Sequence, residues 1–119
     1  MKIGVTADTH SLEVPQALIK DFQSMDLIIH AGDFCSVSDY MLFDGLGELK
    51  AVHGNMDESD LVDRLPRKDI FEIEGYKFGL FHGAGSPQKN LEIVQSEFDF
   101  LPCQYKTTVL RLGYVSHHE

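Results

Sequence analysis

The amino-acid sequence predicts an α/β protein with a parallel sheet, and two observations carry this prediction. Three short apolar runs, each of strand length, lie within the first 53 residues. Two segments whose apolar residues recur near helical spacing separate these runs. The order strand, helix, strand, helix, strand is typical of a parallel sheet with crossover helices.

The elements of this first half are expected in the following order. A strand over residues 2–7 is followed by a helix from Pro15 to about residue 24, since proline favours the first turn of a helix. A strand over 26–30 precedes a helix from Ser38 to about residue 46, for which Ser38 is the expected N-cap. A third strand covers 49–53.

The second half of the chain shows a different pattern. Two apolar runs, 70–73 and 77–81, flank Glu74-Gly75-Tyr76, which predicts an antiparallel hairpin with Gly75 in its turn. A further helix is expected from about residue 88 to residue 97. The sequence shows no repeat and no linker, so we expect one domain over residues 1–119.

Composition and charge exclude several classes of protein. Hydrophobic residues make up 43% of the chain and charged residues 24%, which is typical of a folded globular protein rather than a disordered one. The net charge of −9 disfavours binding to nucleic acid or to an anionic membrane. No apolar run approaches the ~20 residues that span a bilayer, and the N-terminus has no signal-peptide pattern. We therefore expect a cytoplasmic protein.

Side chains that can bind metal ions follow the predicted strands at the point where each strand ends. Because ligands of open α/β sheets bind at the carboxyl ends of the strands, these side chains are expected to gather at one edge. Taken singly, each also has an ordinary role open to it, as a turn residue or as a histidine satisfied at a strand end. Mixed nitrogen and oxygen donors suit Mn²⁺, Fe, Ni²⁺ or Zn²⁺ better than Ca²⁺. The candidates are Asp8, His10, Asp33, Asn55 and His82.

Four short motifs stand in order along the chain: Asp8-Thr9-His10, Gly32-Asp33, Gly54-Asn55-Met56-Asp57 and His82-Gly83. They resemble the ordered motifs of the calcineurin-like metallophosphoesterases, and in particular those of the small bacterial and archaeal phosphodiesterase subgroup. The resemblance covers residue 1 to about residue 98. It implies a four-layer α/β/β/α sandwich around a centre that holds two divalent metal ions.

The resemblance also implies the role of each candidate. One metal ion takes Asp8, His10 and Asp33, and the second takes Asp33, Asn55 and His82, so that Asp33 bridges the two. Asn55 is further implied as a catalytic residue that hydrogen-bonds the phosphate. The implied reaction is hydrolysis of a small-molecule phosphate ester, a diester rather than a monoester, by a hydroxide that the two metal ions activate. Manganese is the expected metal, with nickel, iron and zinc as alternatives.

The C-terminal residues 99–119 depart from the family pattern. A Gly-His-x-His motif, which supplies one histidine to each metal in the family, is absent from the sequence. Aligning Ser116-His117 with the end of that motif makes His117 a candidate metal ligand, whereas a solvated tail is the alternative. Two explanations stay open: a chain truncated or frameshifted after about residue 99, or a shortened family member. Because missing strands leave a sheet edge exposed, some tendency to form a homo-oligomer is expected.

Three further residues carry expectations of their own. In many relatives a histidine that protonates the leaving group follows the asparagine of the Gly-Asn motif. Met56 stands at this position and cannot transfer a proton, so substrates with good leaving groups, such as aryl phosphodiesters, are expected to react best. Asp57 either shapes the loop or donates a proton, and the first role is favoured. His30, at the end of a buried strand, is expected to pack inside the protein or to support a ligand.

The sequence therefore predicts a metal-dependent phosphoesterase, which is a hydrolase. The absent Gly-His-x-His motif favours one alternative, a non-catalytic binding or scaffold protein on the same fold with a defective metal site.

Overall fold

The computed structural model describes residues 1–9, 14–83, 92–93 and 96–98. Most of the helix expected over residues 88–97 lies outside the described residues, and the four of its residues that are described, 92, 93, 96 and 97, are helical. None of the helices in these ranges combines the length and the apolar character that crossing a membrane requires.

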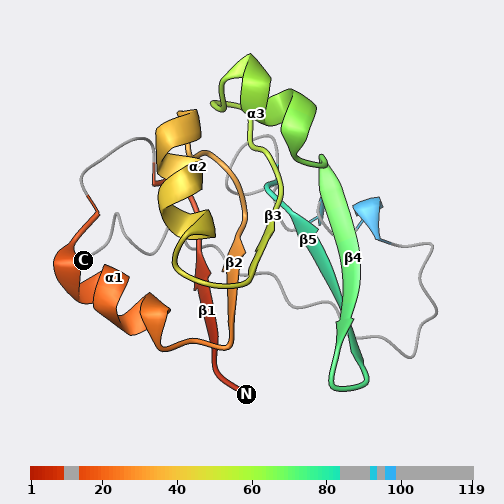
Figure 1. Ribbon diagram of the computed structural model, residues 1–119. Coiled ribbons are helices and arrows are strands. Elements are labelled where there is room, and N and C mark those ends of the chain that lie inside the picture. The colour runs from red at the N-terminus through yellow and green to blue at the C-terminus, as the bar shows by residue number, and fades with distance from the viewer. Residues whose placement is uncertain (10–13, 84–91, 94–95, 99–119) are drawn as a thin grey trace.

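The predicted parallel sheet is confirmed. Its strands are β1 (Ile3–Thr6), β2 (Leu27–His30) and β3 (Leu49–Ala51), which pair in the order β1-β2-β3. Ile3 pairs with Leu27, and Ile28 pairs with Leu49, in parallel register. Helix α1 (Gln16–Gln23) connects β1 to β2, and helix α2 (Val37–Asp44) connects β2 to β3 (Figure 1).

The start of α2 differs from the prediction. Ser36, and not Ser38, is the N-cap residue: its backbone is extended, with φ −120° and ψ 154°, and its side chain accepts a hydrogen bond from the Asp39 N–H at 3.3 Å. Both serines can cap a helix, and they stand two residues apart. Ser36 is the cap because the helix begins at Val37, which brings the Asp39 N–H within hydrogen-bond distance of the Ser36 hydroxyl.

Helix α3 (Ser59–Arg64) was not predicted from the sequence. It has six residues, of which Leu61 is fully buried. Fewer than two helical turns contain too few apolar positions to show a helical period, so the sequence signal for this element is weak.

The predicted hairpin is confirmed, with β4 (Lys68–Ile73) and β5 (Tyr76–Phe81) pairing antiparallel. The turn consists of Glu74 and Gly75, whose φ angles are 50° and 84°. Positive φ at both central residues is the mark of a two-residue type I′ turn, which matches the twist of the flanking strands. Tyr76, expected in the turn, is the first residue of β5 and pairs with Ile73.

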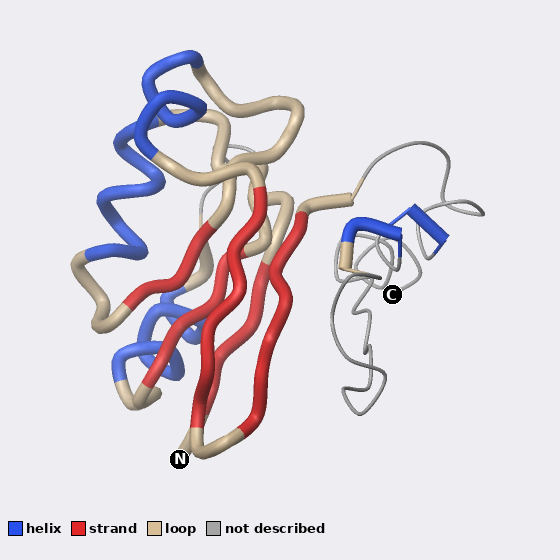
Figure 2. Tube along the Cα trace, turned by 90° about the vertical axis from the view of Figure 1, so that its right-hand side faces the viewer, coloured by secondary structure: helices blue, strands red, loops and turns tan. Residues whose placement is uncertain are grey.

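The parallel sheet is buried on both faces, by two different partners. One face contributes Ile28 and Ala51 to a cluster with Phe22, Phe43 and Leu61 of the three helices. The other face contributes Leu27 and Ile29, together with Ile3 and Val5, and these residues pack against Phe71, Ile73 and Leu80 of the hairpin. Figure 2 shows α1, α2 and α3 on one side of the strands.

The described residues near position 97 cover the outer face of the hairpin, on the side away from the helices (Figure 2). Phe98 is 6% exposed and packs on Gly79, where an added Cβ would come within 2.9 Å of the Phe98 ring. Glu97 forms ion pairs with Arg67 at 2.6 Å and with Lys68 at 3.1 Å. Hydrogen bonds from Arg67 and then Lys68 lower the pKa of the Glu97 carboxyl to about 2. The order of layers is therefore that of the expected α/β/β/α fold.

The position of the N-cap can be tested by replacing each serine. Ser36→Ala removes the side-chain acceptor and is expected to lower the free energy of unfolding by about 1 kcal/mol. Ser38→Ala, the matched control at an exposed position inside the helix, is expected to change it by less than about 0.5 kcal/mol. Urea denaturation followed by circular dichroism measures both, and the reverse order of effects would contradict the assignment.

Candidate metal centre

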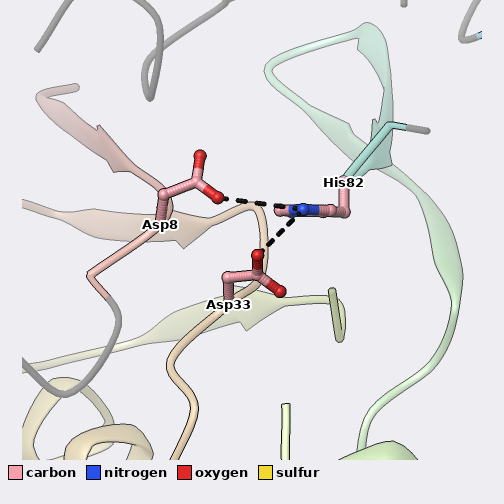
Figure 3. A group of neighbouring side chains, drawn as sticks. All are labelled: Asp8, Asp33 and His82. Carbon is pink, nitrogen blue, oxygen red and sulfur yellow. Dashed lines mark ion pairs between the residues drawn. The ribbon is translucent and has the colours of Figure 1, made fainter. Parts of the chain in front are cut away.

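Three predicted ligands come together at the carboxyl ends of their strands (Figure 3). Asp8 follows β1, Asp33 follows β2, and His82 directly follows β5. One ligand atom from each of these residues lies within 4.8 Å of the others. The His82 Nε2 is 3.3 Å from Asp33 Oδ2 and 3.8 Å from Asp8 Oδ1. Two carboxylates and one imidazole nitrogen therefore converge on a single point.

The backbone at Asp8 and Asp33 turns away from the strand direction. Both residues have positive φ, 56° for Asp8 and 63° for Asp33, which few residues other than glycine adopt and which aspartate tolerates. Two hydrogen bonds continue from the β1–β2 pairing into these turns: the Ala31 N–H donates to the Thr6 carbonyl, and the Asp8 N–H donates to the Gly32 carbonyl, both at 2.9 Å. The two aspartates are thus fixed relative to each other by the backbone.

The ring of His82 is held in one orientation. Its Nδ1 is 2.9 Å from the Ala31 carbonyl oxygen, which can only accept, so Nδ1 carries the proton and donates. In the neutral ring, the Nε2 lone pair is then directed at Asp8 and Asp33. A backbone carbonyl that fixes the tautomer in this way is a common support for a metal-binding histidine.

Asp33 is buried, with 2% of its surface exposed. Its Oδ1 accepts a hydrogen bond from the Met56 N–H at 2.8 Å, and its Oδ2 faces His82. Gly54 lies against the same carboxylate, so closely that an added Cβ would overlap it. Gly32, with φ 107°, lies against the backbone of Gly54: a Cβ added at Gly32 would come within 2.7 Å of the Gly54 nitrogen. The two glycines of the predicted motifs are therefore required by the close approach of two loops.

The other predicted site residues are Asn55, His10 and His117. Asn55 is exposed and adjoins Met56, whose N–H reaches Asp33, so its loop lies at the cluster. His10 and His117 lie outside the described residues. The expected divergence of residues 99–119 also falls outside them.

Asp57 has the loop-shaping role that the sequence analysis favoured. Its carboxylate accepts three backbone hydrogen bonds, from the N–H groups of Asp33 at 3.0 Å, Cys35 at 2.7 Å and Gly54 at 2.7 Å. These donors belong to two loops, since Asp33 and Cys35 follow β2 and Gly54 follows β3. The spacing of residues in the sequence does not indicate this arrangement.

His30 packs inside the protein, as expected. It is fully buried and stacks on Phe34, with the ring centroids 3.5 Å apart. Its Nδ1 accepts a hydrogen bond from the Gly32 N–H at 3.1 Å, so the proton of the neutral ring is on Nε2, which lies 3.1 Å from the Thr9 hydroxyl. Burial, followed by repulsion from His82, lowers the pKa of His30 to about 3. A neutral histidine therefore supports the turn that carries Asp33.

Comparison with known proteins identifies the family. The sequence pattern of the calcineurin-like phosphoesterase superfamily domain matches residues 1–107, and the chain belongs to this superfamily. A probable metallophosphoesterase of Methanothermobacter thermautotrophicus is 38% identical over 92 residues, which are 74% of this chain and 53% of that protein. A second one, from Methanocaldococcus jannaschii, is 44% identical over 90 residues, 70% of this chain and 43% of that protein. The chain spans about half the length of these two relatives.

Solved structures share the fold. The solution structure of a Thermotoga maritima protein matches this chain with a TM-score of 0.68 and 25% sequence identity. The match covers 85% of this chain and 68% of the Thermotoga maritima chain. The crystal structure of Entamoeba histolytica Vps29 complexed with Zn²⁺ matches with a TM-score of 0.65 and 25% sequence identity. This match covers 83% of this chain and 59% of the Vps29 chain.

The buried state of His30 predicts how stability depends on pH. An unfolded histidine binds a proton below about pH 6.5, whereas folded His30 does so only near pH 3. Between these values the unfolded state binds more protons, so the free energy of unfolding falls as the pH falls, by at most about 1.4 kcal/mol per pH unit from this residue. In ¹H–¹³C NMR spectra, the His30 ring signals should stay at their neutral position from pH 7.5 to pH 4.5. Titration of His30 near pH 6.5 would contradict the burial argument.

Proposed function

We propose that this protein is a metal-dependent phosphoesterase that hydrolyses small-molecule phosphate esters, with phosphodiesters preferred over monoesters. The observation that carries the proposal is the convergence of Asp8, Asp33 and His82 within 4.8 Å at the ends of three strands. Membership of the calcineurin-like phosphoesterase superfamily supports it.

The donor set fits a divalent transition metal. Two carboxylates that lie close together repel each other, and a cation between them offsets this repulsion. His82 adds a nitrogen donor whose lone pair is already oriented by the Ala31 carbonyl. Nitrogen and oxygen donors together suit Mn²⁺, Fe, Ni²⁺ or Zn²⁺, and the Zn²⁺ complex of the Entamoeba histolytica relative supports binding of such an ion here. We propose Mn²⁺ as the metal and two ions as the number, with His10 and Asn55 completing the ligand set and His117 as a further candidate.

The residues of this chain have distinct roles in the proposed reaction. Divalent ions, when bound, would polarise the phosphoryl oxygens and lower the pKa of a water molecule so that it attacks phosphorus. Asp8, Asp33 and His82 would hold the ions, and we propose Asp33 as the ligand that the two ions share. Asn55, exposed on the adjacent loop, can offer its side-chain amide to the phosphate. With a net charge of −9, the chain depends on these cations to attract an anionic substrate.

Met56 bears on the choice of substrate. It is 57% exposed, directly after Asn55, and a thioether has no proton to give to a leaving group. Esters whose leaving group departs without protonation are therefore the proposed substrates, and aryl phosphodiesters meet this requirement.

A non-catalytic binding or scaffold protein is the second candidate, and the absence of a Gly-His-x-His motif from the sequence favours it. In that case the cluster would bind metal weakly, and a partner would bind without metal. The cytoplasmic location and the tendency to form a homo-oligomer stay predictions of the sequence analysis.

The primary test is metal stoichiometry together with hydrolysis. After loading with Mn²⁺ and desalting, elemental analysis of the protein should give two equivalents, and bis-aryl phosphodiesters should be hydrolysed. Asp33→Asn keeps the shape and the acceptor for the Met56 N–H but loses the charge, and should lose both the metal and the activity. Asp63→Asn, the same change at an exposed position of α3, should keep both. Full activity in Asp33→Asn would refute the assignment, and a metal-free wild type would favour the scaffold candidate.

A second test restores the missing proton donor. Met56→His places an ionisable side chain beside Asn55, and general acid catalysis contributes roughly 10²- to 10⁴-fold in favourable cases. The variant should therefore gain more in kcat toward alkyl phosphodiesters than toward aryl ones. Met41→His, at an exposed position of α2, is the matched control and should leave this ratio unchanged. Equal gains on both substrate types in Met56→His would contradict the proposed lack of a general acid.

A further inference from the structure

The Asp57 carboxylate joins the two loops that border the metal site. These are the 31–35 loop after β2 and the 53–58 loop after β3. Asp57 Oδ2 accepts from the Asp33 and Gly54 N–H groups, one in each loop, and Oδ1 accepts from the Cys35 N–H. The Glu58 N–H donates in turn to the Cys35 carbonyl at 3.1 Å. Three of these four hydrogen bonds join the two loops, and the bond from Gly54 lies within the 53–58 loop.

The backbone of the 31–35 loop is shaped to receive an anion. Gly32, Asp33 and Cys35 all have positive φ, of 107°, 63° and 74°. Left-handed residues in such a loop turn backbone N–H groups to one side and form a concavity that binds negative charge. The carboxylate of Asp57 occupies this concavity, with the N–H groups of Asp33 and Cys35 as donors.

The same pair of loops also fixes the Asp33 side chain. Met56, next to Asp57 in the chain, donates its N–H to Asp33 Oδ1. Asp33 is thus held twice from the 53–58 loop, at its backbone nitrogen by Asp57 and at its carboxylate by Met56. The other carboxylate oxygen of Asp33, Oδ2, lies 3.3 Å from the His82 Nε2.

We propose that Asp57 is a positioning residue for the metal site: by anchoring the two loops to each other, it fixes the Asp33 carboxylate in the orientation that binds metal. The inference rests on the proposed function, since it assigns Asp57 to the same site. Asp57 itself is outside the candidate metal-binding group, which among the described residues consists of Asp8, Asp33 and His82.

The test compares Mn²⁺ affinity between variants by isothermal titration calorimetry. In Asp57→Asn, one carboxylate oxygen becomes an NH₂ group, which cannot accept, so at least one of the three N–H groups loses its partner. Outer-shell partners of metal ligands typically contribute 10- to 100-fold to affinity, and the dissociation constant for Mn²⁺ should rise by about this factor. Asp63→Asn, on the exposed side of α3, should bind as the wild type does.

Two measurements separate positioning from a general loss of stability. Circular dichroism of the metal-free proteins reports whether Asp57→Asn is folded, and the absorption spectrum of the Co²⁺ complex reports the geometry of its ligands. A folded Asp57→Asn with a changed Co²⁺ spectrum and weaker Mn²⁺ binding supports the proposal. A folded variant with wild-type affinity and spectrum overturns it, even where its melting temperature is lower. A wild type that binds no Mn²⁺ is a failure of the proposed function and is recognised before any variant is compared.

Should Asp57→Asn not fold, the wild-type protein supplies the test. Hydrogen exchange followed by NMR measures the backbone amides of Asp33, Cys35 and Gly54 with and without Zn²⁺. The three amides should be protected in the metal-free protein and more strongly protected with Zn²⁺, because an anchored loop pair and an occupied site stabilise each other. Exchange at unprotected rates, or protection that Zn²⁺ does not change, would overturn the proposal.

Discussion

The site depends on the close approach of the 31–35 loop and the 53–58 loop. Gly32 and Gly54 lie so near each other that a Cβ on either one would meet backbone or carboxylate atoms. This contact lets the Met56 N–H reach Asp33, and it places Asp57 among three backbone donors. The 31–35 loop also receives the Asp8 N–H at Gly32 and the His82 ring at Ala31. Each of the three clustered residues, Asp8, Asp33 and His82, is therefore held by the 31–35 loop, and a shift of this loop would move all of them.

Packing of the hairpin on the parallel sheet brings His82 to the two aspartates. His82 directly follows β5 of the second sheet, and Leu80, two residues before it, packs with Leu27 and Ile29 of β2. Apolar burial between the two sheets is thus coupled to the geometry of the site. On the outer side, Phe98 over Gly79 and the ion pairs of Glu97 hold the covering segment against the hairpin. The exposed ion pairs add little to stability, so the fit of Phe98 into the space left by a missing side chain is the stronger contact.

The sequence predicted what depends on local pattern. Apolar spacing and turn residues predicted the three parallel strands, both crossover helices and the hairpin. The expectation that ligands bind at the carboxyl ends of strands predicted that Asp8, Asp33 and His82 lie at one edge. The N-cap of α2 was predicted at the wrong serine, because Ser36 and Ser38 can both cap a helix. Helix α3 was not predicted, because six residues are too few to show a helical period. The anchoring by Asp57 required left-handed backbone at Asp33 and Cys35, which their residue types do not indicate. Tertiary contact, and not local preference, selects that conformation.

In the proposed function, charge links the binding of metal ions to the binding of substrate. The edge of the sheet carries two carboxylates, one of them buried, in a chain whose net charge is −9. His30 is close by, but burial lowers its pKa and keeps the ring neutral, so His30 adds no positive charge to this edge. A phosphate ester would be repelled by such a site and attracted only when cations occupy it. By thermodynamic reciprocity, a bound phosphate must then strengthen the binding of the metal by the same factor. The proposed anchoring by Asp57 would favour this coupling, because metal ligands that are already held in place need no rearrangement when the metal or the substrate binds.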